Sequence, residues 1–95
     1  MKVLSIIIPV YNEESTIYEV IEKVNAVELT NGITKNIVVV DDQSSDNSLS
    51  RVKDYERDFP GVITIIEHTV NQGKGAGIRS CLPACIGDYI IIQDS

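Results

Sequence analysis

The sequence predicts an α/β protein with a doubly wound parallel sheet of four strands and three helices. Two observations indicate this class. Four short runs rich in isoleucine and valine alternate along the chain with three segments of helical character, as in strand–helix–strand units. The runs are nearly continuous in apolar residues, which is typical of strands covered by helices on both faces. The 95 residues, 43% hydrophobic and 23% charged, fit one globular domain or part of one.

The first half of the chain supplies two predicted strands and one predicted helix. The first strand covers residues 3–10, VLSIIIPV. A helix is predicted over 13–27, and Ser15 is placed to cap it. Its apolar side chains recur at helical spacing, at Ile17, Val20, Ile21 and Val24. The second strand, NIVVV at 36–40, ends directly before two adjacent carboxylates.

The second half of the chain repeats this alternation. An amphipathic helix is predicted over 45–59, followed by a strand over 62–67 and a weaker, glycine-containing helix over 73–87. Pro83 lies inside this last segment, where it removes a hydrogen bond and should kink or end the helix. The fourth strand is predicted over 88–94, DYIIIQD.

Charge and cysteine content exclude several classes of function. The net charge of −6 argues against a nucleic acid partner, because binding to its phosphate backbone needs a basic surface. A local phosphate site remains open, since backbone N–H groups or a bridging metal can hold a phosphate without such a surface. The apolar run at the N-terminus is too short to span a membrane and lacks a signal-peptide cleavage site, so we expect a cytoplasmic protein. Cys81 and Cys85 are expected to be free packing thiols, since zinc would need two more soft ligands and only His68 is present. We expect His68 at the surface, where its strand ends.

Polar side chains follow every predicted strand. Because ligands of doubly wound sheets bind outside the carboxyl ends of the strands, these residues mark the expected site. They are Tyr11, Asn12 and Glu13 after the first strand, Asp41 and Asp42 after the second, His68 and Asn71 after the third, and Asp94 after the fourth.

Each of these groups also has a plain structural explanation. The Tyr11 ring can stack on a base or cover a ribose, whereas Glu13 can simply be an acidic residue in the first turn of a helix. The Asp41–Asp42 pair can accept from nucleobase N–H groups or ribose hydroxyls, or bind a hard cation. Asp46, by contrast, is expected to act with Ser45 as a helix N-cap.

The glycine-rich segment 71–77, NQGKGAG, matches neither of the common phosphate-binding loop patterns. Lys74 and Arg79 can face an anionic ligand from this segment, or they can be solvated cations at an ordinary helix start. Asp94, at the end of the fourth strand, can bind a divalent cation, since Mg²⁺ commonly uses one or two carboxylates and phosphate oxygens.

Four motifs taken together, IIIPVYNEE, VVVDDQSSD, NQGKGAGIR and GDYIIIQDS, resemble the nucleotide-sugar-binding half of family 2 inverting glycosyltransferases. The likeness is closest to the dolichyl-phosphate mannose synthase and polyprenyl-phosphate glycosyltransferase branch. It covers the whole chain, and the motifs come in the family's order. The resemblance implies a Rossmann-like, A-type glycosyltransferase fold. It implies inverting transfer from a UDP- or GDP-sugar, with Mg²⁺ or Mn²⁺, to an acceptor such as polyprenyl phosphate, in cell-envelope or glycan biosynthesis.

The resemblance also assigns roles to residues of this chain. It implies that Asp42 accepts from the nucleobase with Val40 beside it. It implies that Pro9, Tyr11 and Glu13 line the nucleoside pocket.

The metal and the phosphates are assigned in the same way. Asp94 matches the first acid of the family's D-x-D signature, near ribose and metal, and Ser95 matches its middle position. Asp41, Lys74 and Arg79 are further candidates for contacts with the donor.

We expect residues 1–95 to be the N-terminal, donor-binding part of a longer domain, truncated within the D-x-D signature. The general base, the acceptor site and any helices that face the cytoplasmic side of a membrane would then lie beyond Ser95. The chain alone would hold no catalytic residue and transfer no sugar. The strand at 88–94 would present an unprotected apolar edge through which copies of the chain associate.

Two other classes of protein remain as alternatives. A non-catalytic nucleotide-binding or assembly module would use the same donor-binding half without transfer. A receiver domain also pairs two aspartates at a strand end, but on its first strand, whereas here the pair follows the second and the third ends in Glu67 and His68.

Overall fold

The computed structural model describes residues 2–30, 32–68 and 73–93, and the side chain of Lys74 lies outside the described part. Its centre is a parallel sheet with the strand order β3-β2-β1-β4. The strands are β1 (Val3–Val10), β2 (Thr34–Asp42), β3 (Ile63–His68) and β4 (Tyr89–Ile92). The carboxyl ends of these strands therefore meet at one edge of the sheet.

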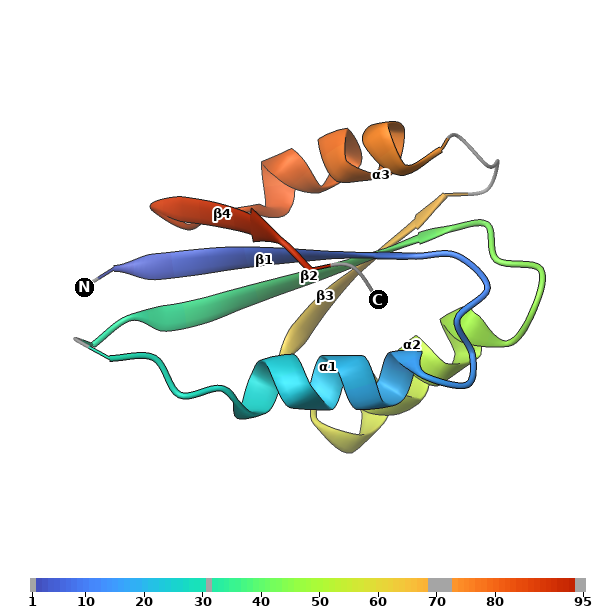
Figure 1. The fold of residues 1–95 in the computed structure, drawn as a ribbon, viewed down its shortest axis with the longest axis horizontal. Coiled ribbons are helices and arrows are strands. Elements are labelled where there is room, and N and C mark those ends of the chain that lie inside the picture. Colours follow the sequence, from blue (N-terminus) through green and yellow to red (C-terminus); the bar gives the residue numbers. More distant parts are fainter. Residues whose placement is uncertain (1, 31, 69–72, 94–95) are drawn as a thin grey trace.

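Helices cover both faces of the sheet (Figure 1). Two of them, α1 (Ile17–Ala26) and α2 (Ser48–Asp58), lie on one face. The other face carries α3 (Lys74–Cys81), which continues into a short 3-10 helix, Leu82–Ala84. The doubly wound α/β class predicted from the sequence is confirmed.

The two faces have cores of different size. Side chains of β1, β2 and β3 pack with α1 and α2 into a large buried cluster of Ile6, Ile8, Val10, Ile17, Ile21, Ile37, Val39, Val52, Tyr55 and Ile63. The buried cluster under α3 is smaller and consists of Ile7, Val38, Val40 and Cys81. Alternate residues of β2 thus serve different cores, since successive side chains of a strand point to opposite faces.

The ends of the first two helices differ from the prediction. The first helix begins at Ile17 rather than at residue 13, because the amides of Thr16 and Ile17 both donate to the carbonyl of Glu13 in a preceding turn (3.1 and 2.9 Å). Thr16, not Ser15, is the N-cap residue, and it makes no side-chain cap hydrogen bond. The second helix begins at Ser48 rather than at residue 45.

The third helix ends where the proline was expected to end it. Helix α3 stops at Cys81, and Pro83 lies in the 3-10 turn that follows. Cys81 and Cys85 are free, as predicted. Burial raises the pKa of the Cys81 thiol to about 11, so Cys81 stays a neutral packing group at physiological pH.

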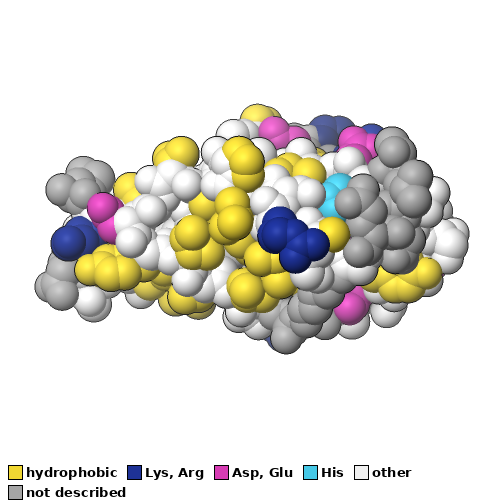
Figure 2. Space-filling model, turned by 90° about the horizontal axis from the view of Figure 1, so that it is seen from above, with side chains coloured by type: hydrophobic (Ala, Val, Ile, Leu, Met, Phe, Trp, Pro, Cys, Tyr) yellow, Lys and Arg dark blue, Asp and Glu magenta, His cyan; other side chains and the backbone are white. Residues whose placement is uncertain are grey.

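Strand β4 lies at the edge of the described sheet and pairs only with β1 among the described strands. Its four side chains are about half exposed, from 46% for Ile91 to 52% for Tyr89. Figure 2, which views the molecule from the α3 side, shows hydrophobic side chains spread across this face. Within the described residues, none of the helices is long and apolar enough to cross a membrane.

Candidate functional site

The candidate site lies at the carboxyl edge, where β1, β2 and β3 end. Strand β2 is longer than predicted and includes both aspartates, since Asp41 pairs in register with Val10 and Asp42 pairs with His68. Asp41 and Asp42 therefore point to opposite faces of the sheet, and their carboxylates do not share one environment. The two adjacent acids are thereby kept apart, although they follow one another in the sequence.

Asp41 lies on the α1 and α2 face and is used by its own loop. Its Oδ2 accepts from the Ser44 amide (3.0 Å), and its Oδ1 accepts from the Ser44 hydroxyl (2.6 Å). The residue is only 2% exposed. The Ser44 hydroxyl in turn accepts from the Asn12 amide (3.0 Å), which links the loop after β2 to the loop after β1.

The same two loops are joined a second time through Ser48 and Asp46. The Glu13 amide donates to the Ser48 hydroxyl (2.6 Å), and the Ser48 hydroxyl donates to Asp46. Asn12, in a left-handed conformation (φ 51°), accepts from the Ser45 amide through its side chain (2.8 Å). We call Asn12, Glu13, Ser44, Asp46 and Ser48 the inter-loop network.

This network perturbs the ionisation of Asp46. Burial alone would raise the pKa of Asp46, but hydrogen bonds from the Ser48 hydroxyl, the Ser48 amide and the Glu14 amide hold it below its ordinary value. Asn47, not Asp46, is the N-cap residue of α2; the Asp46 carboxylate instead accepts from the amide of Ser48, the first residue of the helix (2.9 Å). Asp46 therefore fastens the start of α2 to the loop before α1.

Asp42 lies on the opposite face, beneath α3. Its Oδ1 is 3.0 Å from Nδ1 of His68, and its Oδ2 accepts from the Gly73 amide (2.9 Å). The side chains of His68 and Asp42 are 7% and 12% exposed. The expectation that His68 is a surface residue is wrong, because His68 is the last residue of β3 and α3 covers it. Its Nε2 lies 2.7 Å from the hydroxyl of Ser80 on α3.

The residues expected to line a nucleoside pocket have different exposures. Tyr11, directly after β1, is half exposed, and Glu13 is half-buried. Pro9 is half-buried and is the register partner of Val40. Val40 is 1% exposed and lies under Gly77, where an added Cβ would be 3.6 Å from its Cγ1. The Val40 side chain therefore packs below this edge and presents almost no surface to it.

The predicted cationic and metal-binding residues are only partly described. Arg79 is exposed, and its guanidinium lies 3.7 Å from the position of a Cβ on Gly75. Arg79 thus folds back over the first turn of α3, toward the carboxyl edge of the sheet. Asp94 and Ser95 lie outside the described residues, as does the Lys74 side chain. Nowhere in the described ranges do three or more His, Cys, Asp or Glu side chains gather into a metal-binding group.

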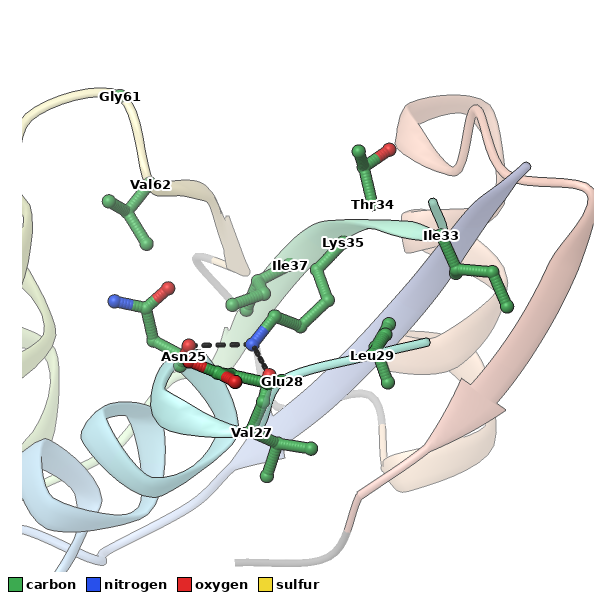
Figure 3. A pocket seen from close by; sticks show the side chains of 10 residues that line it. All are labelled: Asn25, Val27, Glu28, Leu29, Ile33, Thr34, Lys35, Ile37, Gly61 and Val62. Atoms are coloured by element: carbon green, nitrogen blue, oxygen red, sulfur yellow. Dashed lines mark hydrogen bonds between the residues drawn. The ribbon is translucent and has the colours of Figure 1, made fainter. Parts of the chain in front are cut away.

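An open pocket of about 580 Å³ lies at the opposite, amino edge of the sheet (Figure 3). The cation in this pocket, Lys35 of β2, is used by the protein itself. Its ammonium donates to the carbonyls of Val24 (2.9 Å), Asn25 (2.6 Å) and Val27 at the end of α1. Lys35 therefore satisfies carbonyls that the helix leaves without partners, so we assign this pocket a structural role.

Comparison with known proteins connects this geometry to one family. Residues 5–95 match the model of Glycosyl transferase family 2. The chain is 36% identical over 96 residues to a poly(ribitol-phosphate) beta-glucosyltransferase of Bacillus spizizenii, covering 97% of this chain and 14% of the relative. It is 36% identical over 93 residues to an undecaprenyl-phosphate 4-deoxy-4-formamido-L-arabinose transferase of Pseudomonas aeruginosa, covering 97% and 27%. The chain thus spans less than a third of the length of either relative.

Solved structures show the same fold. A mannosyltransferase of Pyrobaculum calidifontis, in complex with GDP-Man and Mn²⁺, superposes with a TM-score of 0.83 at 27% identity, covering 96% of this chain and 26% of the other. TarS of S. aureus, in complex with UDP, superposes with a TM-score of 0.78 at 28% identity, covering 100% and 27%. The fold and the family match agree: this chain belongs to glycosyl transferase family 2.

Proposed function

We propose that this chain forms the donor-nucleotide side of a glycosyltransferase that uses a UDP- or GDP-sugar. The observation that carries the proposal is the Asp42 carboxylate, which is held at the carboxyl edge by His68 and by the Gly73 amide. A carboxylate accepts hydrogen bonds and donates none, so it suits the ring N–H of uracil or guanine. The UDP complex of TarS and the GDP-Man complex of the mannosyltransferase support this class of donor.

Other residues at the same edge complete the donor site in this proposal. The half-exposed Tyr11 ring covers the nucleoside, with Pro9 and Glu13 beside it. Arg79, which lies over the first turn of α3, faces the diphosphate together with the amino end of that helix. Asp41 is 2% exposed, against 8% for Asp42, and both its oxygens accept from Ser44 of its own loop, so we assign it a structural role rather than a contact with the donor.

Asp94 would contribute a carboxylate ligand to Mg²⁺ or Mn²⁺, as its match to the first acid of the D-x-D signature implies, and Ser95, at the middle position, would lie beside the nucleotide. The metal, when bound, neutralises charge on the leaving diphosphate. The Mn²⁺ in the mannosyltransferase complex supports this assignment.

We further propose transfer with inversion to polyprenyl phosphate at the cytoplasmic face of a membrane, with a general base outside residues 1–95. The undecaprenyl-phosphate relative supports this acceptor. The poly(ribitol-phosphate) relative is equally similar and offers the alternative, a hydroxyl of a polymer. Because the chain covers a minor part of both relatives, we expect the 95 residues alone to transfer no sugar. A non-catalytic nucleotide-binding module is the second candidate, and sugar transfer by the full-length protein would exclude it.

Calorimetric titration of UDP and GDP into the full-length protein tests the donor assignment. Replacing Asp42 by Asn should weaken binding by about 1.5–3 kcal/mol, because the change removes a charged acceptor. Asp46→Asn is the matched control, since Asp46 serves the inter-loop network, and it should leave the affinity within a factor of about three. Equal losses in the two variants would contradict the assignment, as would a wild-type protein that binds neither nucleotide.

The exposed edge of β4 supports a proposal about association. We propose that the 95-residue chain on its own pairs with a second copy through β4, since this edge presents half-exposed isoleucines and carries no proline or lysine. Light scattering after gel filtration should show a dimer or larger assembly. Ile91→Lys should shift the assembly toward monomer because a charge at the joint is costly to desolvate. A monomeric wild type, or an assembly that survives Ile91→Lys, would contradict the proposal.

A further inference from the structure

Three side chains from three elements form a continuous chain of polar contacts beneath α3. Asp42 ends β2, His68 ends β3, and Ser80 lies on α3. The contacts are 3.0 Å between Asp42 Oδ1 and His68 Nδ1, and 2.7 Å between His68 Nε2 and the Ser80 hydroxyl. We call these residues the Asp42–His68–Ser80 chain.

The protons in this chain fix the orientation of the imidazole. Since a carboxylate brings no proton, Nδ1 of His68 must carry the hydrogen that Asp42 accepts. Nε2 then either accepts from the Ser80 hydroxyl or donates to it. In the second case the Ser80 proton goes to the Ala76 carbonyl, which lies 3.0 Å away. Both arrangements keep the Nδ1–H group directed at Asp42.

Asp42 is held on its other oxygen as well, by the amide of Gly73 at the start of α3 (2.9 Å). With an N–H donor on each oxygen and a side chain that is 12% exposed, the carboxylate has little freedom to turn. The Gly73 amide can only donate, which suits an ionised carboxylate oxygen as its acceptor. Gly77 brings the backbone of α3 close to the imidazole of His68, since a Cβ added at Gly77 would lie 3.9 Å from Cε1 of His68.

We propose that His68 is a positioning residue for nucleobase selection, held in place by Ser80. The proposal rests on the assignment of Asp42 as the group that reads the base. A fixed carboxylate accepts from the ring N–H of uracil (N3) or guanine (N1). It faces a lone pair at the corresponding nitrogen of cytosine (N3) or adenine (N1). The Asp42–His68–Ser80 chain therefore selects bases whose ring nitrogen donates, and loss of the orientation relaxes that selection.

Two substitutions at His68 separate positioning from packing. In His68→Asn the amide nitrogen takes the place of Nδ1 and can still donate to Asp42. In His68→Gln the amide reaches the place of Nε2 near Ser80 but puts no donor beside Asp42. Affinities of the full-length protein for UDP, GDP and CDP are measured by calorimetry, and thermal melting shows that each variant is folded.

The wild type should prefer UDP or GDP over CDP by about tenfold or more. His68→Asn should keep that preference within about threefold, whereas His68→Gln should lose about tenfold for the preferred nucleotide and little for CDP. Ser80→Ala, which removes the outer contact, should lose about threefold, with Ser50→Ala on α2 as the unchanged control.

Several results would overturn the inference. Equal losses in the Asn and Gln variants, the same loss for all three nucleotides, or an unchanged Gln variant would each show that His68 only packs. If a His68 variant does not fold, Ser80→Ala carries the test, and an unchanged preference in it counts against the proposal. A wild type that binds none of the nucleotides contradicts the proposed function instead.

Discussion

On the face of the sheet under α1 and α2, large aliphatic and aromatic side chains form the main core, whereas the face under α3 buries a smaller cluster. The same division continues into the polar groups at the carboxyl edge. Asp41, on the first face, accepts from Ser44 three positions along the chain. Asp42, on the second, contacts His68 and Gly73, 26 and 31 positions away.

This difference separates the support of the site from its chemistry. The inter-loop network joins the loops after β1 and β2 through serine hydroxyls and carboxylates, and these contacts hold the two loops to one another. The Asp42–His68–Ser80 chain depends on the placement of β2, β3 and α3 relative to one another. The carboxylate at its end, that of Asp42, belongs to a side chain that is 12% exposed. We therefore assign a structural role to Asp41, on the α1 and α2 face, and base recognition to Asp42, on the α3 face.

Truncating one buried side chain in each core should give the largest difference in stability between the two faces of the sheet. Ile21 and Cys81 are both fully buried, on the α1 and α2 face and on the α3 face respectively. Ile21→Ala should lower the free energy of unfolding by about 2–5 kcal/mol through lost burial and a cavity. Cys81→Ala should lower it by about 1 kcal/mol, since only one small group is lost. Urea denaturation measures both, and equal losses would contradict the division into a major and a minor core.

The ionisation of Asp46 tests the structural role of the inter-loop network. Its folded pKa lies below the ordinary value of 3.8, so its contribution to stability is present above that pH and is lost as the pH falls below it. The difference in melting temperature between the wild type and Asp46→Asn should be largest near neutral pH and shrink in acid. The exposed Glu28→Gln provides the control. A difference that does not change between neutral pH and acid would show that the Asp46 charge is not used in this way.

Replacing Gly77, in α3, or Gly87, which precedes β4, by alanine should change the stability of the protein by smaller amounts and in opposite directions. Gly77→Ala should stabilise the protein by about 0.5–1 kcal/mol, because alanine favours the helix. Its Cβ would make only ordinary contacts, 3.6 Å from Val40 and 3.9 Å from His68.

Gly87→Ala is the contrasting variant and should destabilise the protein. Its Cβ would lie 2.7 Å from the Ser5 amide and 2.8 Å from the Val3 carbonyl. Thermal melting of the two variants decides the signs. A destabilising Gly77→Ala would mean that α3 packs more tightly on the sheet than these distances indicate.

The sequence predicted most of the fold because strand and helix patterns are local. The continuous apolar runs marked all four strands, and Pro83 marked the end of α3. Helix starts were less well predicted, since the loops before α1 and α2 are held by contacts between residues more than 30 positions apart, such as Glu13 with Ser48.

Only part of the candidate site could be predicted from the sequence. The carboxyl ends of parallel strands meet at one edge, so Asp41 and Asp42 could be placed there from the sequence. The roles of His68 and Ser80 could not, because they depend on the register of β2 with β3 and on how α3 lies across them. A usable signal was present in His68 itself, an imidazole at the end of a strand that carries three isoleucines.

The central claim is that adjacent aspartates on opposite faces of β2 have different roles. The most direct test is to compare Asp41→Asn and Asp42→Asn in the full-length protein, measuring both the free energy of unfolding and the affinity for UDP and GDP. Asp41→Asn should lower stability by about 1–2 kcal/mol and leave the affinity within about threefold, because only the contact with Ser44 changes. Asp42→Asn should weaken nucleotide binding by about ten- to a hundredfold. Equal losses of affinity in the two variants, or a loss confined to Asp41→Asn, would contradict the account.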